Sequence, residues 1–226
     1  ATNFAALTEL ERGNPVDEPS LDWYRSTLAK VAWLCQTRVD LKTSCSILAS
    51  RQADLRRADV VALWRVLGYL AAHRTSSLHF RRGGSLELVV FADASHAPGP
   101  TRRSQTGGII ALRGTGTVAW VSSIQDTVAH STQAAELAAQ DDLVRRVLRL
   151  QKLLGELTRK DKLFRVAVAC DNEAALAHME RGYVAGGSPS SRKHQEIKFR
   201  GLQQLLARGE TRAVQVPTER MIADVL

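Results

Sequence analysis

The stretch Leu88-Val89-Val90-Phe91-Ala92-Asp93 is an apolar run that ends in an aspartate. A second run of the same kind, Arg165-Val166-Ala167-Val168-Ala169-Cys170, is followed directly by Asp171. Short continuous apolar runs are typical of strands buried on both faces of a sheet. Sheets flanked by helices place their chemistry where such strands end. The sequence therefore predicts two buried strands whose ends bring Asp93 and Asp171 together.

The segments around these two runs alternate between strand and helix patterns. Strands are predicted at 86–94, 106–112, 118–122, 165–170 and 212–216, and the second and third are joined by a Gly-containing turn as a hairpin. Helices are predicted at 132–157, 173–181 and 192–207, with a helical start from 219 onward. Three antiparallel strands extended by crossover strands make a mixed sheet with helices on its faces. The fold class is therefore α/β.

The first third of the chain has a different pattern. Residues 1–20 are polar and read as an extended lead-in, and residues 21–80 form a small helical part. Gly83-Gly84 marks the boundary to a second domain at 86–226. The four tryptophans lie on apolar stripes, so we expect them in the core and not as platforms for stacked bases. They are Trp23, Trp33, Trp64 and Trp120.

Composition limits the class of protein. The chain has 226 residues, of which 44% are hydrophobic and 24% charged, so we expect a globular protein. Its net charge of +8 suits a polyanionic partner, although a merely basic protein stays open. No run of eighteen apolar residues occurs, so no membrane partner is expected. The chain starts at Ala1 with no signal-peptide pattern, and we expect a processed product or a fragment.

The chain has three cysteines, Cys35, Cys45 and Cys170, which cannot all pair with one another because their number is odd. None of them is part of a Cys-x-x-Cys motif. We expect buried, reduced thiols, no zinc site, and an intracellular, reducing compartment.

Two further acids complete a candidate cluster. Glu136 falls in the first turn of the predicted helix 132–157, and Asp224 falls in the C-terminal helical segment. Taken singly, each acid has another reading, because Asp171 could cap a helix and Glu136 could be solvated surface. Taken together, crowded carboxylates repel unless a cation lies between them. An all-oxygen ligand set favours Mg²⁺ or Mn²⁺ over zinc.

The motifs resemble, in order, the end of a copia-type retrotransposon polyprotein, where the tail of the reverse transcriptase is followed by an RNase H domain. The resembling segments are Tyr24-Arg25-Ser26, Thr37-Arg38-Val39-Asp40, Leu63–Leu70, Phe91-Ala92-Asp93-Ala94, Arg103–Gly108, Val118–Ser123, Val128–Glu136, Cys170-Asp171-Asn172, Lys193-His194, Val216-Pro217-Thr218-Glu219 and Ile222-Ala223-Asp224. The chain departs from the family pattern at several positions, among them Val39, Ile124 and Ala134. None of these departures removes one of the four acids.

The resemblance implies an RNase H-like fold, with a five-stranded sheet in the order 3-2-1-4-5. It also implies an endonuclease that uses two Mg²⁺ ions to cut the RNA strand of an RNA–DNA hybrid. In this reading Asp93 is shared by both ions, and Glu136 and Asp171 complete the site. Glu136 is also placed to sense the RNA 2′-hydroxyl, and Asp224 holds the ion on the side of the attacking water.

Basic residues form two candidate nucleic-acid contacts. On the predicted long helix, Arg145, Arg149 and Lys152 share one face, either as a solvated surface or as a stripe that follows phosphates. Arg192 and Lys193 follow a Gly-Ser-rich loop and could approach the substrate. His194 beside them could assist product release, although a lone histidine is often structural.

Three functions stay open at this point. The leading hypothesis is the hybrid-cutting ribonuclease. The second is a catalytically silent RNase H-like module that serves as a structural or RNA-binding subunit of a ribonucleoprotein, with structured RNA or a polymerase domain as its partner. The third is a DNA strand-transfer nuclease on the same fold.

Overall fold

The computed structural model describes residues 13–95, 103–126, 128–129, 131–160, 164–171, 201 and 203–225. Three helices come first: α2 (Glu18–Leu34), α3 (Lys42–Ser50) and α4 (Arg57–Ala72). They are followed by β1 (Glu87–Ser95), β2 (Gln105–Leu112), β3 (Gly116–Ile124), α5 (Thr132–Thr158), β4 (Arg165–Cys170) and β5 (Thr211–Gln215). Short 3₁₀ helices include η2 (Val39–Leu41), η3 (Gln52–Asp54), η4 (Thr218–Arg220) and η5 (Ile222–Val225). Residues 201 and 203–207 are also helical.

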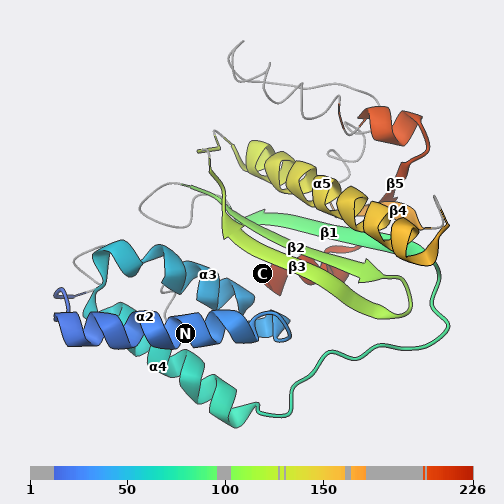
Figure 1. Ribbon diagram of the computed structural model, residues 1–226. Helices are drawn as coiled ribbons and strands as arrows, with labels where there is room; N and C mark the ends of the chain where they lie inside the picture. The colour runs from blue at the N-terminus through green and yellow to red at the C-terminus, as the bar shows by residue number, and fades with distance from the viewer. Residues whose placement is uncertain are drawn as a thin grey trace.

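The strands form one sheet in the order β3-β2-β1-β4-β5. The pairs β1–β2 and β2–β3 are antiparallel, whereas β1–β4 and β4–β5 are parallel. The predicted architecture is therefore confirmed: a five-stranded mixed sheet with the order 3-2-1-4-5 of an RNase H-like fold. Figure 1 shows α5 lying across one face of this sheet, with the three N-terminal helices grouped together beside β3.

The core of the sheet domain lies between α5 and the central strands. Leu88 and Val90 of β1 pack against Leu143 and Val147 of α5. Gly108 of β2 allows this close approach, because a Cβ atom there would lie 2.6 Å from the Leu143 side chain. Alternation along β1 then sends the remaining side chains, including Val89, to the opposite face.

The helical part has its own core and is tied to the sheet. Tyr24, Leu28 and Leu63 are buried within it. Helix α3 packs against β3, and the indole Nε1 of Trp120 on β3 donates to the carbonyl of Cys35, 2.8 Å away. This hydrogen bond joins residues 85 positions apart in the chain and fixes the end of α2 on the sheet.

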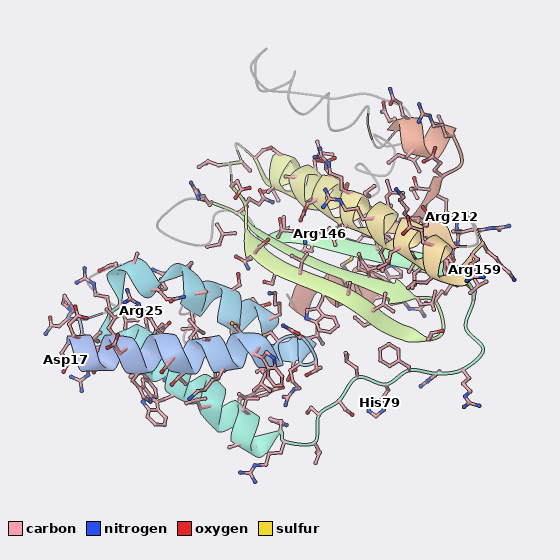
Figure 2. The ribbon with its side chains drawn as sticks, in the orientation of Figure 1. Asp17, Arg25, His79, Arg146, Arg159 and Arg212 are labelled. Carbon is pink, nitrogen blue, oxygen red and sulfur yellow. The ribbon has the colours of Figure 1, made fainter. Side chains whose placement is uncertain are left out.

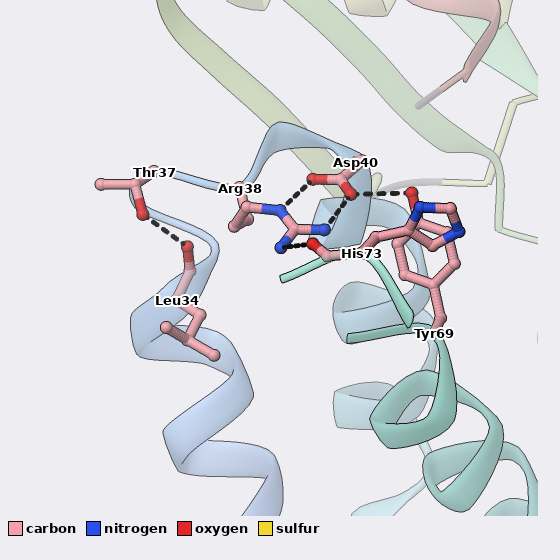
Figure 3. Close-up of polar contacts among 6 residues, drawn as sticks. All are labelled: Leu34, Thr37, Arg38, Asp40, Tyr69 and His73. Carbon is pink, nitrogen blue, oxygen red and sulfur yellow. Dashed lines mark hydrogen bonds and ion pairs between the residues drawn. The ribbon is translucent and has the colours of Figure 1, made fainter. Parts of the chain in front are cut away.

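The turn between α2 and α3 is held to the end of α4 by a polar network (Figure 3). Arg38, which is only 8% exposed, binds both carboxylate oxygens of Asp40 at 3.0 and 2.7 Å. Its third contact is the carbonyl of His73, and the Tyr69 hydroxyl also donates to Asp40. The hydrogen bonds from Arg38 lower the pKa of Asp40, so the carboxylate stays ionised within the network.

Several predicted elements differ in detail. Helix α2 begins at Glu18, before Leu21, because Asp17 caps it by accepting from the Ser20 amide. The C-terminal segment forms 3₁₀ turns rather than an α-helix. The predicted helix 173–181 lies outside the described residues, as do positions 192–200 of the second predicted helix.

The prediction that the tryptophans are core residues is wrong for two of them. Trp33 is 70% exposed and Trp64 is 58% exposed. Trp64 stacks on Trp23 with ring centroids 4.9 Å apart, so the two rings cover each other at the surface between α2 and α4. The stripe spacing identified the helices correctly but not which side of each helix faces inward.

The three cysteines are free and buried, as predicted. In the described part of the chain, none of the helices is long and apolar enough to cross a membrane.

Candidate active site at the ends of β1 and β4

Two of the four predicted acids meet through the register of the parallel strands. Phe91 of β1 stands beside Ala169 of β4. Two residues further along, Asp93 therefore comes level with Asp171, and neighbouring strands lie roughly 4.8 Å apart. Asp93 is partly buried and Asp171, which directly follows β4, is exposed. The prediction that the two strands are neighbours is confirmed.

Helix α5 brings Glu136 to the same edge of the sheet. Ala135 and Ala139 pack on Ala94, the residue after Asp93. On the neighbouring strand, Leu137 packs with Val168 and Cys170. The small alanine side chains allow the backbone of α5 to approach the end of β1 closely, so the turn that carries Glu136 lies between the two strand ends.

A buried amide contact ties the same helix to β4. Gln140, which is 5% exposed, donates from Nε2 to the sulfur of Cys170 at 3.8 Å. Cys170 immediately precedes Asp171. Ser131 caps the helix by accepting from the Ala134 amide at 3.1 Å, which sets where the first turn begins.

The fourth acid, Asp224, lies in η5, which packs against β1 and β2. Ala223 is fully buried and Met221 nearly so, and these two residues anchor the short helix. The side chain of Asp224 lies outside the described residues. Asp93 thus lies in β1 itself, and the other three acids lie in or directly after elements that pair with β1 or pack against it.

The described side chains at this edge of the sheet supply oxygen ligands but do not form a ready-made metal site. Within the part of the chain that the structure describes, no group of three or more His, Cys, Asp or Glu side chains could hold a metal ion. The donor types still fit a hard cation, because the acids at this edge supply carboxylate oxygen alone. The fold therefore brings the backbone of Asp93, Glu136 and Asp171 to one edge of the sheet. The described side chains of these three residues are not close enough together to form a group of three metal ligands.

The basic residues predicted on α5 are exposed and interspersed with acids. Arg145 pairs with Asp141 at 2.8 Å, and Lys152 lies 4.0 Å from Glu156. Arg149 is also exposed on this helix. Arg146 projects from the same helix (Figure 2) and pairs with Asp142. The positive charge of this face is thus partly offset within the helix itself.

The second predicted group of basic residues, Arg192 and Lys193, lies outside the described residues, as does His194.

Sequence reasoning missed a cluster at the opposite end of β1. Glu87, which is 7% exposed, accepts hydrogen bonds from Arg212 of β5 at 2.7 and 2.9 Å and from Arg113 after β2 at 2.6 Å. The hydrogen bonds from Arg212, followed by those from Arg113, lower the pKa of Glu87 to about 2 although its burial opposes this. The sequence does show that Glu87 is a charged residue at the start of an apolar strand. It does not show which residues are its partners.

The N-terminal cysteines also interact. A hydrogen bond between the thiols of Cys35 and Cys45 raises the pKa of Cys35 and lowers that of Cys45. Both thiols are buried in the helical core. This pair lies apart from the acids, which are carried by the sheet, α5 and η5.

Comparisons with known proteins agree with the resemblance. The chain is 26% identical over 209 residues to the retrovirus-related Pol polyprotein from transposon RE1 of Arabidopsis thaliana, which is 90% of this chain and 14% of that protein. It is 36% identical over 118 residues to the secreted RxLR effector protein 161 of Plasmopara viticola, which is 51% of this chain and 82% of that protein. It thus spans about one seventh of the polyprotein's length. No family model matches the chain.

Among solved structures, the chain overlaps RNase H1 from Halobacterium salinarum with a TM-score of 0.43 and 13% identity. The overlap covers 61% of this chain and 90% of that one.

Proposed function

We propose that this protein is a magnesium-dependent endoribonuclease that hydrolyses the RNA strand of RNA–DNA hybrids, because over most of its length the chain is similar to retrovirus-related Pol polyproteins of transposons. One observation carries the proposal. The strand order and register bring Asp93 level with Asp171, and α5 packs on the residues beside both of them. Glu136 lies in the packed turn of that helix. An RNase H-like sheet with acids at this edge is suited to binding metal-bridged phosphate.

Asp93, Glu136, Asp171 and Asp224 would hold two Mg²⁺ ions, with Mn²⁺ as a substitute. When bound, the ions would supply the charge that polarises the scissile phosphate and activates a water molecule. Asp93 would be a ligand of both ions, and Asp224 would hold the ion on the side of the attacking water. Glu136 also contacts the 2′-hydroxyl of the RNA strand, which is how a protein distinguishes RNA from DNA.

Basic residues outside the group of acids bind the phosphates of the substrate. Arg145, Arg149 and Lys152 contact phosphates along α5, and Arg192 and Lys193 contact them from the segment after Asp171. His194 assists release of the cleaved strand. A polymerase domain is the natural partner of such a nuclease within a polyprotein, and a reducing, intracellular compartment suits its three free thiols.

A second candidate function is a catalytically silent module that binds RNA as a subunit of a larger ribonucleoprotein. It is favoured by one observation: among the described side chains, no three potential ligands are grouped closely enough to hold a metal ion. It predicts hybrid binding without cleavage.

The test is cleavage of an end-labelled RNA–DNA hybrid by the wild-type chain, by Asp93→Asn and by Glu136→Gln. Glu156→Gln is the matched control for Glu136→Gln, because Glu156 is an exposed acid near the other end of the same helix. We expect RNA-strand cleavage by the wild type and by Glu156→Gln, and a loss of at least about a hundredfold in the other two variants, since each loses a ligand of the reacting centre. Hybrid binding without cleavage at any Mg²⁺ or Mn²⁺ concentration would support the silent module instead.

A further inference from the structure

Gln125, the residue after β3, joins two elements through its side-chain amide. It is 9% exposed, and its Nε2 donates to the Thr106 hydroxyl of β2 at 3.1 Å and to the Ala135 carbonyl of α5 at 2.9 Å. Its own backbone amide donates to the Ser104 carbonyl at 2.8 Å. The side chain therefore spans from the sheet to the first turn of the helix and is itself fixed at its base.

Helix α5 does not need this contact in order to form. Its start is capped by Ser131, which receives the Ala134 amide on its hydroxyl and the Ala135 amide on its carbonyl. A backbone carbonyl has two lone pairs, so Ala135 accepts from Gln125 in addition to its ordinary helical bond. The added hydrogen bond thus serves to place the first turn of the helix relative to the sheet.

The two residues that accept hydrogen bonds from Gln125 are close in the fold to Asp93 and Glu136. Thr106 pairs with Ala94, which follows Asp93 in β1. Ala135 precedes Glu136 in the chain. The buried amide of Gln125 therefore links β2, which pairs with the strand of Asp93, to the first turn of α5, which carries Glu136.

We propose that Gln125 is a positioning residue, which sets the separation of Asp93 and Glu136 and through it the affinity of this edge for divalent cations. This inference rests on the proposed nuclease function for its catalytic consequence. Glu136 lies on a first turn that is also held by the Ser131 cap and by the packing of Ala135 and Leu137. A donor that is fixed to the sheet restricts that turn, and carboxylates must be held to fractions of an ångström to share a cation.

The chain offers a matched control. Gln151, further along the same helix, also donates its Nε2 to a backbone carbonyl, that of Phe164 before β4. This contact has the same chemistry and joins the same helix to a neighbouring strand. Phe164 lies six residues from Cys170, at the opposite end of β4 from Asp171. Loss of either amide removes one hydrogen bond from α5, but only the loss at Gln125 acts on the turn that carries Glu136.

The experiment compares Gln125→Ala, Gln125→Met and Gln151→Ala. Methionine is unbranched and similar in length to glutamine but has no N–H donor, so Gln125→Met removes the donor without adding a charge or opening a large cavity. Hydrogen exchange is measured at the amides of residues 136–139, which are bonded within the first turns, and cleavage of the hybrid is measured against Mg²⁺ concentration. Thermal unfolding shows whether the variants are folded and equally destabilised.

We expect exchange at residues 136–139 to quicken about five- to tenfold in both Gln125 variants, the change that corresponds to the loss of one hydrogen bond. It should stay unchanged in Gln151→Ala. The Mg²⁺ concentration for half-maximal cleavage should rise severalfold in the Gln125 variants, with KM for the hybrid unchanged.

Equal exchange and equal Mg²⁺ dependence in Gln125→Ala and Gln151→Ala would overturn the inference. If the wild type does not cleave the hybrid, the proposed function fails on its own. The exchange rates at residues 136–139 then still decide whether Gln125 holds the helix turn.

Discussion

Glu87 provides a direct test of how the sheet is held together. Its carboxylate lies at the start of the central strand and binds Arg113 beyond β2 and Arg212 on β5 (Figure 2 shows Arg212). The clamp therefore fixes both neighbours of the β1–β4 pair, and β5 leads on to the segment that carries Asp224. We predict that Glu87→Gln lowers the free energy of unfolding at neutral pH.

The magnitude follows from the pKa of the group. The pKa of Glu87 is lowered from 4.5 to about 2 in the folded protein, which corresponds to roughly 3 kcal/mol between the two protonation states. The side chains of Arg113 and Arg212 are 58% and 52% exposed, so water screens the attraction. We therefore expect a loss of about 1–2 kcal/mol at pH 7.

The pH dependence has a definite sign. Because the folded pKa is lowered, the stabilisation is fully present above pH 4.5 and is lost as the pH falls toward about 2. Urea unfolding of the wild type and of Glu87→Gln from pH 7 to pH 3 measures this difference. It should narrow steadily below pH 4.5, while Glu156→Gln, which alters an exposed acid, should stay within about 0.5 kcal/mol of the wild type throughout. A variant as stable as the wild type at pH 7, or a difference in unfolding free energy that does not narrow in acid, would show that the Glu87 ion pairs do not stabilise the sheet.

Three further outcomes are expected. Arg38→Ala should destabilise the protein by about 2–3 kcal/mol in urea unfolding, because it leaves a partly buried carboxylate without its guanidinium partner; no loss would show that the network is not a clamp. Gly108→Ala should lower the unfolding free energy by about 1–3 kcal/mol, because the added methyl group meets the Leu143 side chain; an unchanged melting temperature would contradict that close approach. Alanine at three basic positions of α5 should weaken hybrid binding and lower its logarithmic salt slope by about 2–3, as measured by fluorescence anisotropy, and an unchanged slope would identify a solvated face. These positions are Arg145, Arg149 and Lys152.

The sheet could be predicted because its strands are defined by local patterns. The run 165–170 forms a strand with the predicted bounds, and the strand predicted at 86–94 is shifted by one residue at each end. Both segments are continuous apolar runs, and such runs need little information from elsewhere in the chain. The order of the strands followed from the ordered family motifs, and the observed pairing confirms it.

The contacts between distant segments could not be predicted. Glu87 and Arg212 are 125 residues apart, and nothing in either local sequence indicates the other. The prediction that Trp33 and Trp64 are buried was wrong for a related reason. Helical spacing shows that apolar residues share a face, but the packing of three helices decides which face is covered.

For the four acids, the sequence predicted which helices and strands carry them better than it predicted how their side chains are arranged. Asp93 and Asp171 are level because two strands pair in one register, and the packing of alanines brings the turn of Glu136 beside them. Gln125 was not singled out, because a polar residue after a strand usually belongs to a turn. Only the folded chain shows that its amide reaches both β2 and α5.

We propose that the acids at the ends of β1 and β4 form one cation site for cleavage of a hybrid. The most direct measurement is anomalous scattering from Mn²⁺ in crystals of the protein with an RNA–DNA hybrid whose scissile phosphate resists hydrolysis. We expect Mn²⁺ peaks between Asp93, Glu136 and Asp171, beside the RNA strand, and we expect them to be lost in Asp93→Asn. Ordered hybrid with Mn²⁺ bound elsewhere, or with no Mn²⁺ at this edge of the sheet, would rule out the proposed site.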